Sequence, residues 1–125
     1  MKAFYLKVTA LLLFGFINSS LYSQSKNIEV KSLYTDSLSS SYEIIVQDSV
    51  RLHYHAEHTE HLFVLEGKAR MQIDEELIEI SKGEYYTIPK GAKHAVWVLS
   101  ESPLKVISVQ CPQFFGNDRH FIEND

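Results

Sequence analysis

Short hydrophobic runs, most of them alternating with polar residues, recur along the chain from residue 27 to residue 109. Alternation with a period of two is typical of a β-strand that is buried on one face. No stretch beyond residue 23 has a convincing helical period. The predicted strands cover 27–34, 42–46, 49–55, 62–65, 69–73, 77–80, 85–88, 95–99 and 104–109. Short strands separated by Gly, Pro, Asp and charged residues predict an all-β sandwich or barrel.

The first 23 residues follow a different pattern. Lys2 and Lys7 accompany an apolar run over residues 8–17, and a stretch of small polar residues follows. This layout is typical of a secretory signal peptide, and the run is too short to remain as a membrane anchor. We therefore expect residues 1–23 to be removed, leaving an exported protein, periplasmic or secreted, without a stable membrane anchor. The alternative is a hydrophobic helix that packs on the rest of the chain.

Length and charge place residues 24–125 in a single domain that does not bind nucleic acid. The whole chain has 125 residues and a hydrophobic fraction of 45%, which is ordinary for a globular protein. Without Lys2 and Lys7, 10 basic residues stand against 16 acidic ones, a formal charge of −6. An acidic domain with scattered basic residues excludes an electrostatic nucleic-acid interface. Cys111 is the only cysteine, so it cannot form an internal disulfide. A buried thiol is expected, and the alternatives are an exposed reactive thiol or a disulfide between chains.

Two histidines one residue apart indicate a metal site. In a strand, side chains at i and i+2 leave the same face, so His53 and His55 can converge on one ion while Tyr54 points away. A short turn can bring in Glu60 from the next strand, and His94 follows a tight turn marked by Gly and Pro. Three imidazoles and one carboxylate suit one divalent transition metal, which the sequence leaves open among Fe, Mn, Ni, Co, Cu and Zn. The alternative is a set of solvated surface histidines without a metal.

The same residues carry a resemblance to a known family. Residues 53–67, HYHAEHTEHLFVLEG, resemble the first motif of the cupin superfamily, and residues 83–94, GEYYTIPKGAKH, resemble its second motif. The family's metal ligands fall on His53, His55, Glu60 and His94, and its structural glycines and proline fall on Gly67, Gly83, Gly91 and Pro89. The resemblance spans about residues 42–109. It implies a double-stranded antiparallel β-helix, the jelly-roll barrel of cupins, followed by a tail over residues 110–125.

Two positions depart from the family pattern. Gln47 stands where the family often has glycine, and Val98 stands where it often has asparagine. Neither position is a ligand in the resemblance, so the metal set is unaffected. The departures make this chain a divergent member and weaken the transfer of any particular activity.

Strand alternation also predicts which side chains line the interior. Counting back from His53 places Arg51 on the inner face, and counting forward from His94 places Val96 and Val98 there. We expect Arg51 to act in the catalytic site by binding an anionic substrate group, most simply a carboxylate, because a guanidinium suits bidentate oxygen recognition. The alternative is an ordinary salt bridge at the barrel rim.

The same count assigns other ring side chains. His58 lies in the turn between the ligands and is expected to be solvated, with a base beside the metal ligands as the alternative. His61 is expected to face away from Glu60. One of Tyr85 and Tyr86 is expected to line the cavity.

An apolar outer face is also expected on one strand, at Phe63 and Leu65. A second subunit would cover this face, which predicts a homodimer. Burial of these residues against the domain's own other sheet is the equal alternative.

The function expected from these features is a metal-dependent enzyme that acts on a small organic molecule. Cupins include dioxygenases, isomerases, lyases and plain binding proteins, so the resemblance leaves the reaction open. No nucleotide fingerprint or Ser/His/Asp order is present to identify one. The main alternative is a binding module that holds a metal or small ligand without turnover, and a sensor or scaffold with an apolar outer face is a third.

Overall fold

The computed structural model of this chain describes residues 27–123, which form ten β-strands and no helix. The first five strands are β1 (Ile28–Thr35), β2 (Ser40–Val46), β3 (Ser49–Tyr54), β4 (Thr59–Glu66) and β5 (Lys68–Ile73). The other five are β6 (Glu76–Ser81), β7 (Tyr85–Ile88), β8 (His94–Val98), β9 (Leu104–Cys111) and β10 (His120–Phe121). Over these residues no helix is long and apolar enough to span a membrane.

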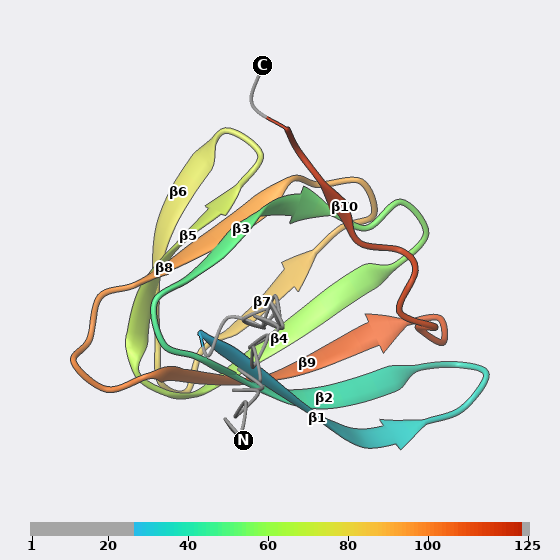
Figure 1. Ribbon diagram of the computed structural model, residues 1–125, viewed down its shortest axis with the longest axis horizontal. Helices are drawn as coiled ribbons and strands as arrows, with labels where there is room; N and C mark the ends of the chain where they lie inside the picture. Colours follow the sequence, from blue (N-terminus) through green and yellow to red (C-terminus); the bar gives the residue numbers. More distant parts are fainter. Residues whose placement is uncertain (1–26, 124–125) are drawn as a thin grey trace, which may run out of the picture.

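The strands form two five-stranded antiparallel sheets that face each other around a common interior (Figure 1). One sheet has the order β1-β2-β9-β4-β7, and the other has the order β10-β3-β8-β5-β6. Strands far apart in sequence, such as β3 and β8 or β2 and β9, therefore pair directly. This arrangement confirms the predicted all-β jelly-roll barrel.

The alternation along β9 shows how the interior forms. Leu104, Val106, Ser108 and Gln110 are buried, and each residue between them is only half-buried. Aliphatic side chains from both sheets pack together because neighbouring strands repeat this pattern. The core consists of Val46, Leu62, Val64, Ala69, Met71, Ile80, Ile88, Ala92, Val96, Leu104 and Val106. Burial of each large member stabilises the fold by about 1.5–3 kcal/mol.

The turn from β4 to β5 requires a glycine. Gly67 has a φ of +83°, a left-handed conformation that costs a residue with a Cβ atom about 1–2 kcal/mol. A Cβ atom on Gly67 would also lie 2.6 Å from the backbone oxygen of Pro103. Gly83 has a φ of +89°, but a Cβ atom there would meet nothing within 4 Å. Among the glycines of residues 27–123, only Gly67 therefore combines a left-handed backbone with a close approach of another chain segment.

All nine predicted strands are present, with ends that differ from the prediction by no more than three residues. The short strand β10 was not predicted, because its two residues, His120 and Phe121, are too few to show a period. It pairs with the edge of β3 and brings the C-terminal tail against the barrel. The predicted signal peptide, residues 1–23, lies outside the described residues, and the exported location stays a prediction.

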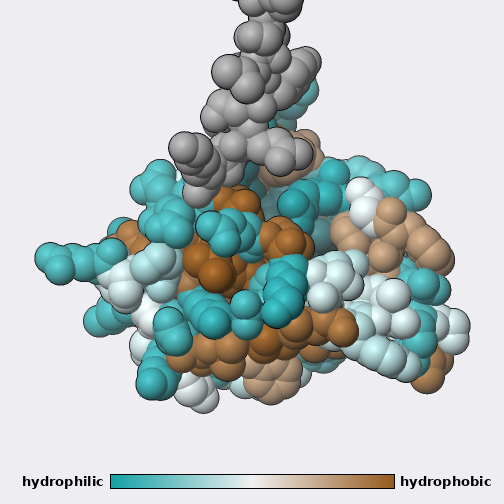
Figure 2. All heavy atoms as spheres, turned by 60° about the horizontal axis from the view of Figure 1, so that its bottom comes forward, coloured by the Kyte–Doolittle hydropathy of each residue, from teal (hydrophilic) through white to brown (hydrophobic). Residues whose placement is uncertain are grey.

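The outer face of the first sheet carries exposed apolar side chains. Phe63 and Leu65 are 44% and 37% exposed, and Tyr85 on β7 is 49% exposed. The expected apolar outer face is therefore present, and Phe63 and Leu65 are not buried against the other sheet. Figure 2, viewed from the side of β1 and β2, also shows hydrophobic patches among hydrophilic side chains. The homodimer that would cover such a face stays a prediction.

Candidate metal centre

Three histidines lie together in the barrel interior. His53 belongs to β3, His55 directly follows β3, and His94 begins β8. The side chains meet because β3 and β8 are neighbours and His53 stands opposite His94. Their ligand nitrogens all lie within 4.8 Å of one another, and each residue is no more than 4% exposed. This group could hold a metal ion.

Glu60 approaches the histidines from the opposite sheet. It lies on β4 and is 6% exposed, and its Oε2 atom is 3.4 Å from His55 Nε2 and 3.2 Å from His94 Nε2. Its Oε1 atom accepts a hydrogen bond of 2.5 Å from the Ser108 hydroxyl on β9. The structure thus brings together all four side chains that the sequence predicted as ligands. The role of Glu60 as the fourth ligand stays a prediction.

Backbone carbonyl groups orient each imidazole. The Nδ1 atom of His53 lies 2.7 Å from the Arg51 oxygen, and Nδ1 of His94 lies 2.9 Å from the Ala92 oxygen. The Nδ1 atom of His55 lies 2.5 Å from a carbonyl oxygen of the C-terminal tail. A carbonyl can only accept, so each Nδ1 donates, and in a neutral ring the Nε2 atom is left with a free lone pair. A histidine that binds a metal through Nε2 needs this orientation.

Two of these Nε2 atoms have no hydrogen-bond partner. Nε2 of His55 and Nε2 of His94 are buried and unpaired among the described residues. An unpaired buried polar atom usually costs free energy, so its presence calls for an explanation. A cation bound between the two rings and the Glu60 carboxylate would supply the missing partner, so these residues fit a metal ion.

The electrostatics of the site favour an ionised Glu60 carboxylate beside a neutral His53 ring. Burial lowers the pKa of His53 to about 4, helped by the neighbouring His94 ring. Burial would raise the pKa of Glu60, but the interactions with His55 and His94 hold it well below its ordinary value. Burial would also lower the pKa of His55, yet the Glu60 carboxylate and a backbone carbonyl outweigh that effect and raise it. The carboxylate therefore favours a positive charge at this centre.

A carboxylate in the C-terminal tail, which was not predicted from the sequence, anchors the loop that carries the ligands. Asp118 is 6% exposed, and its side chain accepts hydrogen bonds from the backbone N–H groups of Ala56 at 2.9 Å and Glu57 at 2.8 Å. Its backbone oxygen is the acceptor for His55 Nδ1. The tail therefore holds both the loop that follows β3 and one of the candidate ligands.

His58 is part of the same network, which corrects the expectation that it is solvated. It is 6% exposed, with Nδ1 2.5 Å from Asp118 Oδ2 and Nε2 2.9 Å from the Gln113 oxygen. The Phe114 ring packs edge-on against it at 5.1 Å between centroids. The turn position misled the prediction because the residues that cover His58 come from a tail more than 50 positions away in the sequence.

Two polar residues on β9 extend the site. Ser108 donates to Glu60, and Gln110 donates through Nε2 to the Ser108 oxygen at 3.4 Å. Both share the inner face with Leu104 and Val106. Alternation along β9 contained this signal, since two polar residues continue the buried series of an otherwise apolar strand.

A cavity of about 60 Å³ adjoins His53, Glu60 and His94, and its lining corrects the placement of Arg51. The lining is otherwise aliphatic except for a single cation, Arg119 in the tail. Arg51 is exposed, and its guanidinium lies 4.8 Å from the centroid of the Phe121 ring.

A register shift in β3 explains why Arg51 does not face the interior as predicted. The pairing between β3 and β8 shifts between Val50 and His53, which breaks the alternation on which the prediction relied. Val50 takes the position in the cavity lining that the sequence analysis assigned to Arg51. Val96 does line the cavity as predicted, and Val98 is partly buried against the core.

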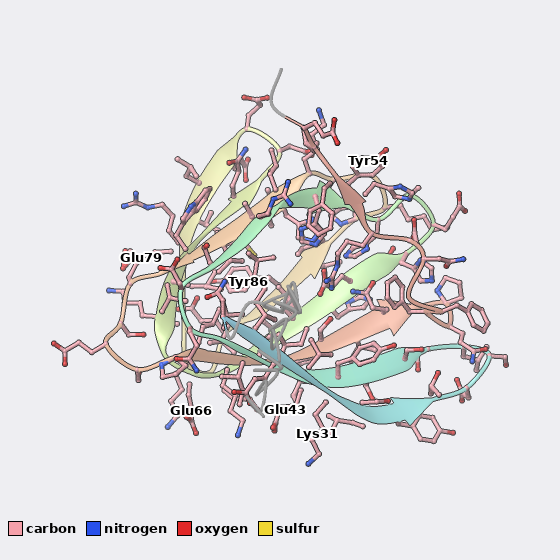
Figure 3. All side chains as sticks on the ribbon, in the orientation of Figure 1. Lys31, Glu43, Tyr54, Glu66, Glu79 and Tyr86 are labelled. Atoms are coloured by element: carbon pink, nitrogen blue, oxygen red, sulfur yellow. The ribbon has the colours of Figure 1, made fainter. Side chains whose placement is uncertain are left out.

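The two neighbouring tyrosines of β7 occupy opposite faces. Tyr85 is on the outer side, where its hydroxyl lies 2.6 Å from His61 Nδ1, so His61 faces outward as predicted. Tyr86 packs against the core and points toward β6, with its hydroxyl 3.5 Å from the Glu79 oxygen (Figure 3). Tyr86 is therefore the inward member of the pair, although it does not line the cavity beside the histidines.

Comparison with known proteins agrees with this fold. The family model described as Cupin domain (Cupin_2) matches residues 41–110. An uncharacterised protein of Aquifex aeolicus is 31% identical over 98 residues, which cover 78% of this chain and 80% of that protein. Among solved structures, KdgF from Halomonas sp. has a TM-score of 0.68 at 18% identity, covering 73% of this chain and 85% of the other. PAC13 from Streptomyces, solved with uridine, has a TM-score of 0.69 at 12% identity, covering 78% and 79%.

Proposed function

This chain belongs to the family of cupin domains, and on that premise we propose that it is a metal-dependent enzyme acting on a small carboxylate-bearing molecule. His53, His55 and His94 would hold one divalent transition metal, with Glu60 as the fourth ligand. Neutral imidazoles and a single carboxylate suit the transition metals better than Mg²⁺ or Ca²⁺, which prefer oxygen ligands.

The pair of unpartnered imidazole nitrogens is the observation that carries the proposal. Within residues 27–123, Nε2 of His55 and Nε2 of His94 are buried without a hydrogen-bond partner, and both lie within 3.4 Å of the Glu60 carboxylate. Each unpaired buried group costs about 1–3 kcal/mol. Two such atoms beside an ionised carboxylate are readily explained if a cation completes the site.

The division of tasks follows from the donor set and its surroundings. A divalent metal held by these ligands supplies Lewis acidity that polarises a carbonyl or carboxylate oxygen. The backbone oxygens of Arg51 and Ala92 keep the His53 and His94 rings in one tautomer. The aliphatic lining of the cavity limits the access of water, which strengthens the electrostatic interactions inside it. Oxygen-dependent cleavage, isomerisation and lyase chemistry are the reaction types to be distinguished.

A second candidate function is binding without turnover, and one observation favours it. The cavity of about 60 Å³ beside the histidines is lined by aliphatic residues, apart from His53, Glu60, His94 and Arg119. No described side chain outside the ligand set and Arg119 therefore stands ready to transfer a proton there. A metal or small-ligand module would need no such group.

Metal content tests the centre itself. The wild-type protein, purified without added metal, is expected to hold one metal ion per chain by elemental mass spectrometry. His94→Ala should weaken metal binding by about 100-fold or more, because it removes a ligand. The matched control is His61→Ala, which removes an outward histidine of β4 and should leave the metal content unchanged. Equal metal content in the two variants would refute the centre.

Turnover separates the enzyme from the binding module. Oxygen uptake and product formation should be screened over small carboxylic acids and phenolic compounds with metal-loaded protein. Activity that disappears on chelation and returns on reloading supports the enzyme. Saturable binding of a small acid with no product supports the module instead.

A further inference from the structure

Arg119 stands between two adjoining cavities. The inner one, about 60 Å³, contains His53, Glu60 and His94 in its lining. The outer one, about 430 Å³, is lined by residues of β1, β2, β9 and the tail. Arg119, Val30 and Ile44 line both. A small molecule in the outer cavity could therefore contact Arg119 while pointing one end toward the metal centre.

The guanidinium of Arg119 has no ionic partner among residues 27–123. The adjacent carboxylate, Asp118, is instead occupied by Ala56, Glu57, His58 and His120. A cation beside a cavity without a partner is available to an anionic ligand.

One residue of the outer cavity, Gln110, carries an amide oxygen that has no hydrogen-bond partner among residues 27–123. Gln110 is 4% exposed and lines this cavity. Its Nε2 atom donates to Ser108, whereas its Oε1 atom is buried and meets no donor in the part of the chain that the structure describes. Leaving such an acceptor unpaired is costly, so a ligand that donates a hydrogen bond here would remove the cost. A ligand hydroxyl group is the simplest such donor.

We propose that the outer cavity is a binding site for a small hydroxycarboxylic acid. Arg119 pairs with the carboxylate, and Gln110 Oε1 accepts a hydrogen bond from the hydroxyl group. An aliphatic body of the ligand packs on Val30 and Ile44. This assignment rests on the proposed function in so far as the bound acid is the substrate presented to the metal centre, and it names the chemical class of that substrate.

Three related probes test the recognition on the wild-type protein. α-Hydroxyisovalerate has the charge, the hydroxyl and a branched aliphatic body, whereas isovalerate lacks the hydroxyl and α-hydroxyisovaleramide lacks the charge. Affinities should be measured by NMR titration on zinc-loaded and on metal-free protein. The hydroxy acid is expected to bind about tenfold or more tightly than either analogue, since each lacks one polar contact. Equal binding of the acid and its amide would overturn the proposal.

Variants assign the two contacts. Arg119→Met should lower the affinity for α-hydroxyisovalerate about tenfold or more and remove the preference for acid over amide. Arg119→Lys keeps the charge and should retain part of that preference. Gln110→Met should make hydroxyisovalerate and isovalerate bind equally. Arg51→Met tests whether Arg51, the other candidate cation, binds the carboxylate instead. Arg70 is an exposed arginine on β5, and Arg70→Met is the control for a general loss of positive charge.

The outcomes separate this inference from the metal proposal. If zinc binds but Arg119→Met leaves the hydroxy acid affinity unchanged, the binding site is wrong and the metal centre stands. If no metal binds, the preference of the metal-free protein for acid over amide still decides the assignment. A loss of affinity with Arg51→Met and none with Arg119→Met would place the anion site on β3 and overturn it.

Discussion

The two halves of the barrel interior differ in chemistry although the same strands build them. On β9, Leu104 is 2% exposed and belongs to the aliphatic core, whereas Ser108 is 0% exposed and hydrogen-bonds to Glu60. On β4, Glu60 and Val64 show the same division. Burial is equally complete in both halves, so burial alone does not distinguish a core from a site. The difference lies in what the buried atoms require.

Each half is held together by a different interaction. Aliphatic burial stabilises the fold directly, by about 25 cal/mol for each Å² removed from water. Buried polar groups only avoid a penalty when they are hydrogen-bonded, as Ser108 is to Glu60. Three buried atoms have no hydrogen-bond partner among the described residues: Gln110 Oε1, His55 Nε2 and His94 Nε2. The polar half therefore gives up stability that the aliphatic half supplies, which is expected of a binding site.

Leu104→Ala and Ser108→Ala test this division on one strand. Leu104→Ala should lower the free energy of unfolding by about 2–5 kcal/mol, because it removes buried atoms and leaves a cavity. It should leave the dissociation constant for zinc within about twofold, since the aliphatic side chain of Leu104 can neither bind a metal nor hydrogen-bond to a candidate ligand. Ser108→Ala should weaken zinc binding about 10–100-fold, because the hydroxyl orients Glu60.

Urea unfolding of the metal-free variants gives the stability, and competition with a chromogenic chelator gives the zinc affinity. Equal changes in zinc affinity for the two variants would contradict the division between the two halves. A stability loss of about 1–3 kcal/mol for Ser108→Ala would support it, because this is the usual penalty for a buried acceptor without a partner, here Glu60 Oε1.

Gly67→Ala tests the turn beside the aliphatic half. The left-handed backbone alone should cost about 1–2 kcal/mol, which is also expected for Gly83→Ala. Gly67→Ala should cost clearly more, because its Cβ atom would lie 2.6 Å from Pro103 O and 3.0 Å from Leu104 Cα. Thermal unfolding of the two variants provides a matched comparison. Equal melting temperatures would show that the close approach carries no cost.

Asp118→Asn tests whether the tail positions a ligand. The substitution replaces one carboxylate oxygen by an amide nitrogen, which cannot accept from the backbone N–H groups of the loop after β3. Zinc affinity should fall about 10–100-fold, as for other groups that orient metal ligands. The control is His120→Ala, which removes the exposed partner of the same carboxylate and should leave the affinity unchanged.

Leu104→Ala provides a further control for Asp118→Asn, because it is expected to lower the stability through a residue of β9 and not of the tail. If Asp118→Asn and Leu104→Ala shift the zinc affinity alike, the tail acts only through general stability. A loss confined to Asp118→Asn supports a positioning role.

The sequence predicted the parts of the site that depend on local spacing. His53 and His55 share a face because strand side chains alternate, and the cupin motif identified Glu60 and His94. The strands were predictable for the same reason. Ser108 and Gln110 could have been found from the alternation of β9, since polar residues there continue a buried series.

The remaining contacts depend on packing between distant segments. Asp118 and Arg119 lie in a tail without periodicity, so no local pattern shows that the tail returns to β3. The register shift between Val50 and His53 is invisible to a count by two, and it misplaced Arg51. His58 was misread because a turn residue becomes buried only when a distant segment covers it.

The smallest expected effect concerns Tyr86, at the edge of the aliphatic half. Burial and the Glu84 carboxylate, which its hydroxyl contacts, raise the pKa of Tyr86 to about 12. A tyrosine in the unfolded chain titrates near 10, so the stabilising neutral form is fully present below pH 10 in both states. Between pH 10 and 12 the unfolded state loses its proton first, so stability falls as the pH rises.

Urea unfolding at pH 9 and 11 should show a larger loss in the free energy of unfolding for wild type than for Tyr86→Phe. Tyr34→Phe, at a residue that is 62% exposed, should behave as wild type. Equal losses for wild type and Tyr86→Phe would mean that Tyr86 contributes nothing to the alkaline fall in stability.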